Sequence, residues 1–254
     1  MEELSKRKLA LYSGLESKKQ RLKSGLFAVE GTKSVSDTLG YYPLEALVIK
    51  KGVELPETIL HFIPEDKICE TSRQGMDKLS SLSTSPDMIA IYHLPECNIK
   101  DFAQLPEDLY LMLDGVQDPG NLGTIIRTAH WFGIKRIFAS KDTVDIYNPK
   151  TIQATMGSLP HVEVLYCNLE EVVTANPSLP VYGLLLEGKN IYKASLEGKG
   201  FIVMGNEGKG ISPMLRRSVT FPLLIPPYDP DAHGESLNVA IATAVTLSTF
   251  RSKV

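Results

Sequence analysis

The chain has 254 residues, of which 43% are hydrophobic and 22% are charged, and its formal net charge is −3. This composition is ordinary for a globular protein of one large or two modest domains. The net charge gives no global basic field, which weighs against nucleic-acid binding but leaves room for a local basic patch.

The cysteines and the apolar runs narrow the class further. Three cysteines are scattered along the chain without a C-x-x-C pair, at positions 69, 97 and 167. Their odd number and spacing favour a reducing compartment over a disulfide framework or a zinc site. The N-terminus lacks the apolar run of a signal peptide, and no run of about 20 apolar residues is present for a membrane span. We expect a cytoplasmic protein with no metal site and no membrane partner.

The first 35 residues are locally basic, with eight Lys and Arg residues against four Glu residues. The commoner interpretation of such a run is a solvated helical face. The functional interpretation is an arm that contacts RNA phosphates. The basic residues of this region are Lys6, Arg7, Lys8, Lys18, Lys19, Arg21, Lys23 and Lys33.

Short strands and helices alternate through the first third of the chain and predict a small α/β domain. An apolar piece at 26–29 precedes a helix that runs from about Thr32 to Leu39. Strands are expected at 44–49, 60–63 and 88–92. The polar stretch Pro95 to Pro106 has proline at both ends and is the expected boundary, so we predict domains over 1–100 and 106–254.

The second domain begins with an apolar strand at 109–113, typical of a strand buried on both faces of a parallel sheet. A loop rich in Gly, Pro and Asp follows. Asn121 or Asp118 can cap the next helix, expected over 122–132, and Gly133 can end it. Arg127 lies near the start of this helix, where the helix dipole disfavours a cation. It is either an exposed surface arginine or a residue that holds an anionic or polar substrate.

The remainder of the second domain alternates strands with helices. This order predicts a mostly parallel sheet with helices on both faces and a ligand site outside the carboxyl ends of the strands. Asn148 and Pro149 give one helix an N-cap and a proline at its first position. The expected strands are 134–139, 162–166, 181–186, 201–204 and 219–225, and the expected helices are 150–156, 169–174 and 212–217.

Two glycine patterns invite a nucleotide-binding interpretation, and neither supports it. Residues 183–190, GLLLEGKN, imitate the spacing of a phosphate-binding loop, but Asn190 replaces the hydroxyl residue and the residues between the glycines are typical of a strand. Residues 205–210, GNEGKG, do not match the dinucleotide pattern GxGxxG and precede only a short helix. Three glycines in six residues still allow close approach of the backbone to a ligand.

The stretch 225–242 leads from the end of an apolar strand into a helix expected over 239–250. A polar cluster of Glu235, Ser236 and Asn238 precedes that helix, and we expect Ser236 to cap it. The helix itself has almost no polar face, which predicts burial on several sides. The cluster is either a cap on a core helix or a ligand site at the free N–H groups of the helix start.

Three loops together, at 114–129, 203–212 and 225–242, resemble the three signature motifs of the SpoU/TrmH family of RNA ribose 2′-O-methyltransferases, within the SPOUT superfamily. The first loop contains the family's Asn121 and Arg127. The second contains the run from Asn206 to Gly210, and the third contains Ile-Pro and Ser-Leu-Asn-Val. Residues 24–31 resemble the start of the family's N-terminal substrate-binding domain, which is similar to ribosomal RNA-binding proteins. One departure is the stretch 227–234, a few residues longer than the family's glycine-rich link, which puts the cofactor lid and the dimer contacts in question.

The resemblance implies a fold, a cofactor and an assembly. The second domain is expected to be α/β with a mostly parallel sheet and a deep trefoil knot, the first a smaller α/β RNA-binding domain. The family's homodimer completes its active site across the interface. S-adenosylmethionine is the implied methyl donor, and no metal is required. The implied cofactor-binding residues are Met204, Gly205, Asn206, Gly210, Ile225, Pro226, Ser236, Leu237 and Asn238.

The implied catalytic residues are Arg127, Asn121, Glu207, Ser236 and Asn238. An arginine is essentially always protonated, so a general-base role for Arg127 demands a strongly perturbed site, whereas binding the target phosphate does not. Ribosomal RNA is the preferred substrate, with transfer RNA as an alternative. A non-catalytic RNA-binding or ribosome-assembly factor and a nucleotide-binding enzyme are the alternative functions.

Overall fold

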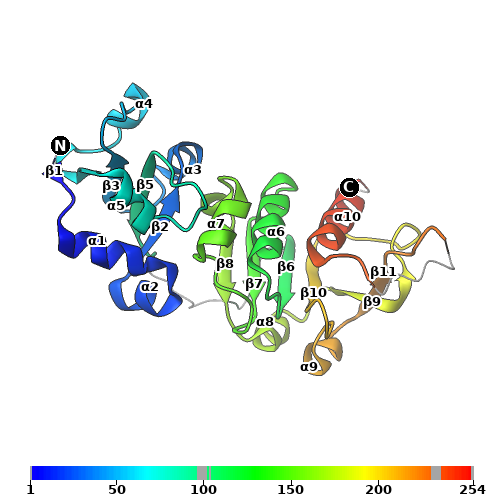
Figure 1. Ribbon diagram of the computed structural model, residues 1–254. Coiled ribbons are helices and arrows are strands. Elements are labelled where there is room, and N and C mark those ends of the chain that lie inside the picture. Colours follow the sequence, from blue (N-terminus) through cyan, green and yellow to red (C-terminus); the bar gives the residue numbers. More distant parts are fainter. Residues whose placement is uncertain (1, 96–101, 103, 230–235, 253–254) are drawn as a thin grey trace. The chain divides into compact units, whose positions relative to one another are not determined.

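The computed structural model describes residues 2–95, 102, 104–229 and 236–252, and it contains two compact units (Figure 1). The first unit comprises the described residues of 1–96 together with 145–160, and the second comprises those of 97–144 and 161–254. The predicted boundary at Pro95–Pro106 falls largely outside the described residues, so the limits 1–100 and 106–254 stay predictions.

The first unit is built on a five-stranded mixed sheet in the order β1-β4-β3-β5-β2. Strand β5 pairs antiparallel with β2 and β3, whereas β4 pairs parallel with β3 and β1. The strands are β1 (Glu2–Glu3), β2 (Leu26–Glu30), β3 (Leu44–Lys50), β4 (Ile68–Thr71) and β5 (Met88–His93). The helices are α1 (Lys6–Ser13), α2 (Lys18–Ser24), α3 (Thr32–Thr38), α4 (Glu57–Leu60) and α5 (Arg73–Leu79), with short 3-10 helices η1 (Gly14–Glu16) and η2 (Glu65–Lys67).

The strand expected at 60–63 is wrong. Leu60 ends helix α4, and Phe62 lies in the following turn with 71% of its surface exposed. The sheet position is taken instead by β4, whose Ile68 and Cys69 are buried and pair with Leu47 and Val48 of β3. A short apolar run does not reveal by itself whether it has a pairing partner, and here the neighbouring run has one.

Residues 145–160 pack on the first unit although they lie between two strands of the second in the sequence. The guanidinium of Arg21, which is 2% exposed, donates to Asp145 at 2.6 Å. The ring of Tyr147 lies 4.6 Å from that of Phe27 on β2. Helix α7 (Pro149–Thr155) also contacts β2, and Asn148 caps it as predicted by accepting a hydrogen bond from the backbone N–H of Lys150.

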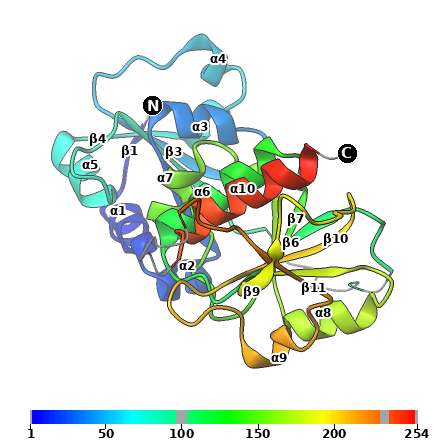
Figure 2. The ribbon, with the colours of Figure 1, turned by 90° about the vertical axis from the view of Figure 1, so that its right-hand side faces the viewer.

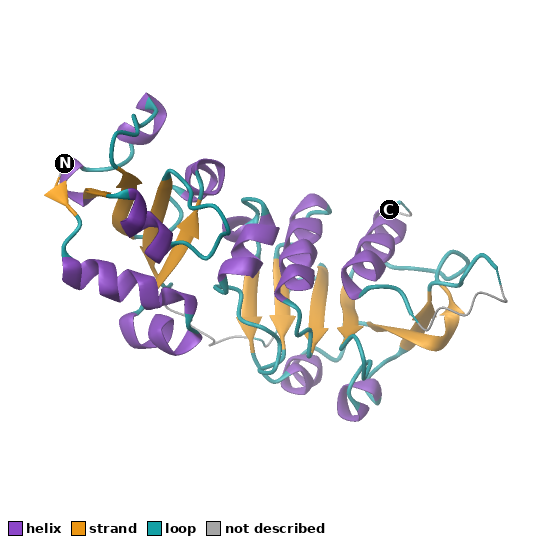
Figure 3. Ribbon diagram, viewed as in Figure 1, coloured by secondary structure: helices purple, strands orange, loops and turns teal. Residues whose placement is uncertain are grey.

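The second unit contains a six-stranded sheet in the order β11-β9-β10-β6-β7-β8, in which every pairing is parallel. Helices α6 and α10 cover one face, and α8 and α9 cover the other (Figures 2 and 3). The predicted parallel sheet with helices on both faces is therefore confirmed. The strands are β6 (Leu109–Asp114), β7 (Arg136–Ala139), β8 (Glu163–Tyr166), β9 (Val181–Asn190), β10 (Gly200–Gly205) and β11 (Phe221–Leu224), and the helices are α6 (Pro119–Trp131), α8 (Leu169–Ala175), α9 (Pro213–Arg216) and α10 (Val239–Arg251), with the 3-10 helix η3 at Leu159–His161.

The centre of this sheet is buried on both faces. Residues 109–113 of β6 are all buried and pair in register with 200–204 of β10, as the continuous apolar runs predict. Residues 183–190 lie wholly in β9, so the false phosphate loop is strand. A side chain at Gly188 would place its Cβ 2.3 Å from the backbone of Leu223, so the approach of β11 explains that glycine. No helix in the described part of the chain is long and apolar enough to cross a bilayer.

Candidate active site

The loop after β10 is a closed turn organised by one side chain. Asn206 and Gly210 exchange two backbone hydrogen bonds of 3.0 and 2.9 Å, and Gly210 has a φ of 68° that suits glycine. Asn206 Oδ1 accepts the N–H groups of Gly208 and Lys209 at 3.0 and 2.9 Å. Its Nδ2 donates to the carbonyl of Gly115 at 2.7 Å, which ties this loop to the one after β6.

Gly205 is required by the closure of this turn. A Cβ at this position would lie 2.3 Å from the carbonyl carbon of Gly210 and 2.4 Å from the nitrogen of Ile211. The sequence predicts that these glycines let a ligand approach the backbone, whereas at Gly205 the structure supplies a reason within the chain itself. Any larger residue at 205 would open the turn that places Glu207.

A chain of three polar side chains links the loops, and all three are among the predicted catalytic residues. Asn121 Nδ2 donates to Glu207 Oε1 at 3.0 Å, and Asn238 Nδ2 donates to Asn121 Oδ1 at 2.9 Å. These partners are 86 and 117 residues apart in the sequence. We call this group the Glu207–Asn121–Asn238 chain. It fixes the relative positions of the β10 loop and the starts of α6 and α10.

The cap of α6 is one of the two residues predicted for it, whereas the cap of α10 differs from the prediction. Asp118 caps α6 by accepting the N–H of Asn121 at 2.7 Å, which leaves the Asn121 side chain available for the polar chain. The cap of α10 is Asn238, whose Oδ1 accepts the N–H groups of Ala240 and Ile241 at 2.9 and 3.3 Å. The expectation that Ser236 caps α10 is wrong, because the helix begins at Val239 and the capping position is the residue immediately before it.

Arg127 does not join the polar chain. It is exposed on α6 and lies six residues after Asn121, so at 100° per residue the two side chains leave the helix in clearly different directions. Trp131 follows one turn later on the same side and is 85% exposed. Within the described residues Arg127 makes no ion pair.

The remaining predicted residues differ in how deeply they are buried. Ser236 and Leu237 are exposed, Ile225 and Pro226 are half-buried, and the Met204 side chain is buried in β10. Met204 therefore presents only backbone groups to any ligand. Glu235 and residues 230–234 of the longer loop lie outside the described residues.

Helix α10 is buried along much of its surface and leaves one side exposed within one chain. Ile241 is 53% exposed, and Ser248 is exposed as well. The buried side includes three threonines whose hydroxyls bond to carbonyls four residues earlier, at 2.7 to 2.8 Å. The threonines Thr243, Thr246 and Thr249 satisfy their own polar groups and so can face the core.

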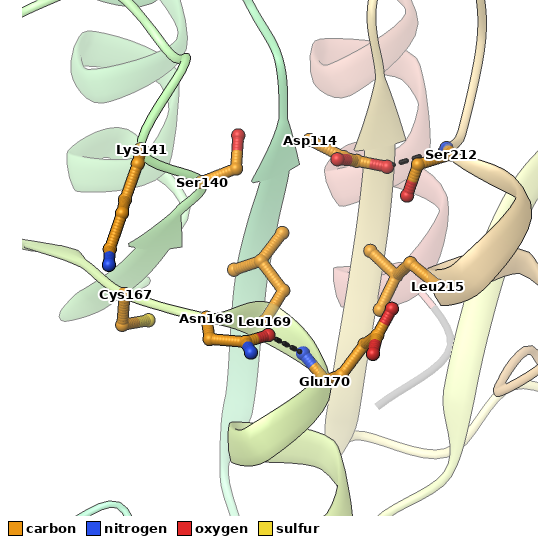
Figure 4. A pocket seen from close by; sticks show the side chains of 9 residues that line it. All are labelled: Asp114, Ser140, Lys141, Cys167, Asn168, Leu169, Glu170, Ser212 and Leu215. Atoms are coloured by element: carbon orange, nitrogen blue, oxygen red, sulfur yellow. Dashed lines mark hydrogen bonds between the residues drawn. The ribbon is translucent and has the colours of Figure 1, made fainter.

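A separate cavity of about 270 Å³ opens at the carboxyl ends of β6, β7 and β8 (Figure 4). Asp114, Ser140, Lys141, Asn168 and Ser212 are among its lining residues, and none of the predicted site residues is. Asp114 Oδ2 accepts the N–H of Ser212 at 2.6 Å across one wall. The cavity and the Glu207–Asn121–Asn238 chain are thus two different places on the same edge of the sheet.

Comparison with known proteins defines the class to which these loops belong. The chain is a member of the SpoU rRNA Methylase family, whose pattern matches residues 108–248, and residues 8–90 match the MRM3-like substrate binding domain. The family resemblance and the α/β fold with a parallel sheet are confirmed.

Individual relatives match over nearly the whole length. The chain is 29% identical to the 23S rRNA (guanosine(2553)-2′-O)-methyltransferase RlmP of Bacillus subtilis, with 99% of this chain and 98% of the relative covered. A solved structure from Porphyromonas gingivalis, described as a possible RNA methyltransferase of the TrmH family, is 35% identical with a TM-score of 0.86 and 99% of each chain covered. An AdoMet-bound rRNA methyltransferase from Sinorhizobium meliloti is 26% identical with a TM-score of 0.85, covering 100% of this chain and 97% of that one.

Proposed function

We propose that this protein transfers a methyl group from S-adenosylmethionine to a ribose 2′-hydroxyl of structured RNA, with ribosomal RNA as its substrate. The observation that carries the proposal is the Glu207–Asn121–Asn238 chain, because it joins one residue from each of the three family motifs. Family membership and relatives named as rRNA 2′-O-methyltransferases support the reaction and the substrate.

The other predicted cofactor-binding residues fit an adenosine-containing cofactor. Ile225, Pro226 and Leu237 supply apolar surface that is at least partly exposed. Met204, Gly205 and Gly210 would contribute backbone groups. The Asn206 side chain is engaged in its own turn, so we assign it the task of shaping the cofactor loop. Ser236 and Asn238 complete the proposed cofactor contacts at the start of α10.

The main demand of the reaction on the protein is to align the ribose hydroxyl with the methyl group. The cofactor supplies a methyl carbon on a sulfonium centre. Transfer of that methyl group would form an O–C bond on the ribose as the S–C bond breaks, and the hydroxyl proton would pass to water. In this proposal Glu207, Asn121 and Ser236 orient the ribose, while Asn238 fixes the start of α10. Arg127 binds the target phosphate, a role that suits a permanently charged guanidinium.

The position of Arg127 supports a homodimer in which each active site takes this residue from the other subunit. Arg127 and Trp131 lie on an exposed face of α6, and Ile241 is exposed on α10, the helix packed against α6. A symmetric partner covering this surface would bury Trp131 and Ile241. It would also bring a second copy's Arg127 to the polar chain.

Complementation tests this arrangement. Arg127→Ala and Asn121→Ala should each be inactive, but subunits mixed after denaturation and refolding should recover about one quarter of wild-type activity, because half of the dimers are mixed and each has one intact site. Mixtures that stay as inactive as the separate variants would place Arg127 and Asn121 in the same subunit's site.

Calorimetry with S-adenosylmethionine tests the function itself, using the wild type and Asn238→Ala. We expect micromolar binding to the wild type and much weaker binding to the variant. Methyl transfer from labelled cofactor to in vitro transcribed large-subunit rRNA, compared with a tRNA pool, then identifies the substrate. Binding without transfer to any RNA would favour a non-catalytic RNA-binding factor. The trefoil knot belongs to the same proposal and rests on the family resemblance. The cytoplasmic location belongs to it as well and rests on the scattered cysteines, which favour a reducing compartment.

A further inference from the structure

We infer that helices α1 and α2 form a docking surface for the phosphate backbone of folded RNA. The inference rests on the proposed function and adds to it the part of the first unit that grips the substrate. The surface, here called the α1–α2 surface, consists of six exposed cations: Lys6, Arg7, Lys8, Lys18, Lys19 and Lys23.

The six cations have no carboxylate partner among the described residues. By contrast, Lys33 pairs with Asp37 at 2.8 Å, and Lys50 pairs with Asp87 at 2.6 Å. The α1–α2 surface therefore keeps its positive charge available to a partner, although the chain as a whole is slightly acidic.

Local stability does not account for where these cations stand. Lys6, Arg7 and Lys8 occupy the first turn of α1, and Lys18 and Lys19 occupy the first turn of α2. Neither first turn contains an acidic residue, although the helix dipole favours acids and disfavours cations there. The only carboxylate in the sequence from 6 to 24 is Glu16. The arrangement concentrates basic side chains on two neighbouring helices, and a positively charged surface attracts phosphates.

Arg21, the one buried basic residue among positions 6–24, holds α2 in place rather than facing solvent. Arg21 is buried, donates to the carbonyls of Leu15 and Glu16 at 2.8 Å each, and pairs with Asp145. These bonds fix α2 to the 3-10 helix η1 that connects it to α1, so the exposed cations are held on a rigid support. Arg21 is therefore neither part of a solvated helical face nor a phosphate contact, because its guanidinium is buried in an ion pair within the first unit.

The chemistry of the surface favours backbone contacts with folded RNA over reading of unstacked bases. Tyr12 is the only aromatic residue between 6 and 24, and its side chain is buried against the sheet. The surface thus offers no exposed ring on which a base can stack, which single-strand readers use. Lysine ammonium groups bind phosphates as point charges, and double-stranded RNA is recognised largely through its shape and its backbone.

The salt dependence of RNA binding tests the inference. The test variant replaces Lys6, Lys8, Lys19 and Lys23 with Gln. The control variant replaces Lys33, Lys50, Lys199 and Arg216 with Gln and removes the same charge from cations that have carboxylate partners. Binding of in vitro transcribed large-subunit rRNA is measured between about 50 and 200 mM salt. Circular dichroism and cofactor calorimetry confirm that both variants fold and keep the cofactor site.

We expect the slope of log K against log salt to become shallower by about 3 in the test variant, since each lost phosphate contact removes about 0.7–0.9. The affinity at the lower salt should fall at least about tenfold, and the control should follow the wild type. Equal losses in both variants, or a slope unchanged in the test variant, would overturn the inference. Methyl transfer by the wild type separates the two proposals: transfer with an unchanged slope rejects the surface alone, and a changed slope without transfer rejects the function alone.

Discussion

Helices α6 and α10 have the same length, pack against each other and begin at the same site, yet they are built differently at their starts. In α6, Asp118 caps the helix and Asn121, three residues later, serves the polar chain. In α10, Asn238 does both, with its Oδ1 on the helix N–H groups and its Nδ2 on Asn121. The difference shows that stability and function are separable at one helix start and joined at the other.

Substitution of Asn238 should have the largest effect because it removes both tasks. Asn238→Ala is expected to destabilise the protein by about 1 kcal/mol through the lost cap. It should also reduce methyl transfer about 100-fold through the broken link to Asn121. Thermal unfolding and single-turnover transfer measure the two losses. Asn238→Asp keeps a good cap and loses the Nδ2 donor, so it should recover the stability but not the activity. Full activity in Asn238→Asp would show that the link to Asn121 is dispensable.

Asn121→Ala should reduce methyl transfer without reducing stability. The cap on α6 remains with Asp118, so the free energy of unfolding is expected to stay within about 0.5 kcal/mol of the wild type. Methyl transfer should still fall about 100-fold, because Glu207 and Asn238 lose their common partner. The matched change is Asp118→Ala, which should cost about 1 kcal/mol of stability with a smaller effect on transfer. A stability loss in Asn121→Ala as large as that in Asp118→Ala would contradict the comparison.

The far ends of the two helices also differ, and Arg251 is the third test. This residue, in the last turn of α10, donates from Nε to the carbonyl of Phe132 at the end of α6, at 2.9 Å. Arg251→Ala should lower the free energy of unfolding by about 1–2 kcal/mol, since a half-buried carbonyl loses a charged donor. Cofactor affinity should not change, because the contact lies at the opposite end of both helices from the site. Chemical denaturation measures the loss of stability, and calorimetry with the cofactor checks that its affinity is unchanged.

The smallest expected effect concerns His130, in the last turn of α6. Its ring stacks on that of His161 at 4.4 Å between centroids. Burial, and secondarily His161, lower the pKa of His130 below its usual value of 6.5. The unfolded chain therefore takes up the proton more readily, and the contribution of this group to stability is present above about pH 6.5 and is lost as the pH falls. Histidine ring titration by NMR should show the pKa of His130 rising in His161→Ala, and a pKa that stays where it was would exclude His161 as a cause.

Much of the second unit was predictable because its signals are local. The continuous apolar runs gave β6 and β10, and Asn148 with Pro149 gave the start of α7. The first unit was harder to predict from the sequence, as the misplaced strand at 60–63 shows. The choice between two neighbouring apolar runs depended on which one could pair with β3. The grouping of residues 145–160 with the first unit was equally hidden, since a single ion pair to Arg21 and the packing of Tyr147 on Phe27 span more than a hundred residues of sequence.

The sequence by itself determined the class of the protein and the identity of the residues that gather at the three loops, because the motifs require particular side chains at fixed spacings. Only the tertiary structure decided what each of them contacts. It assigned the cap of α10 to Asn238, gave Gly205 a role in closing its own turn, and left Arg127 on the exposed face of α6. Hydrogen bonds between residues so far apart depend on how the loops meet in space, and no local pattern encodes that meeting.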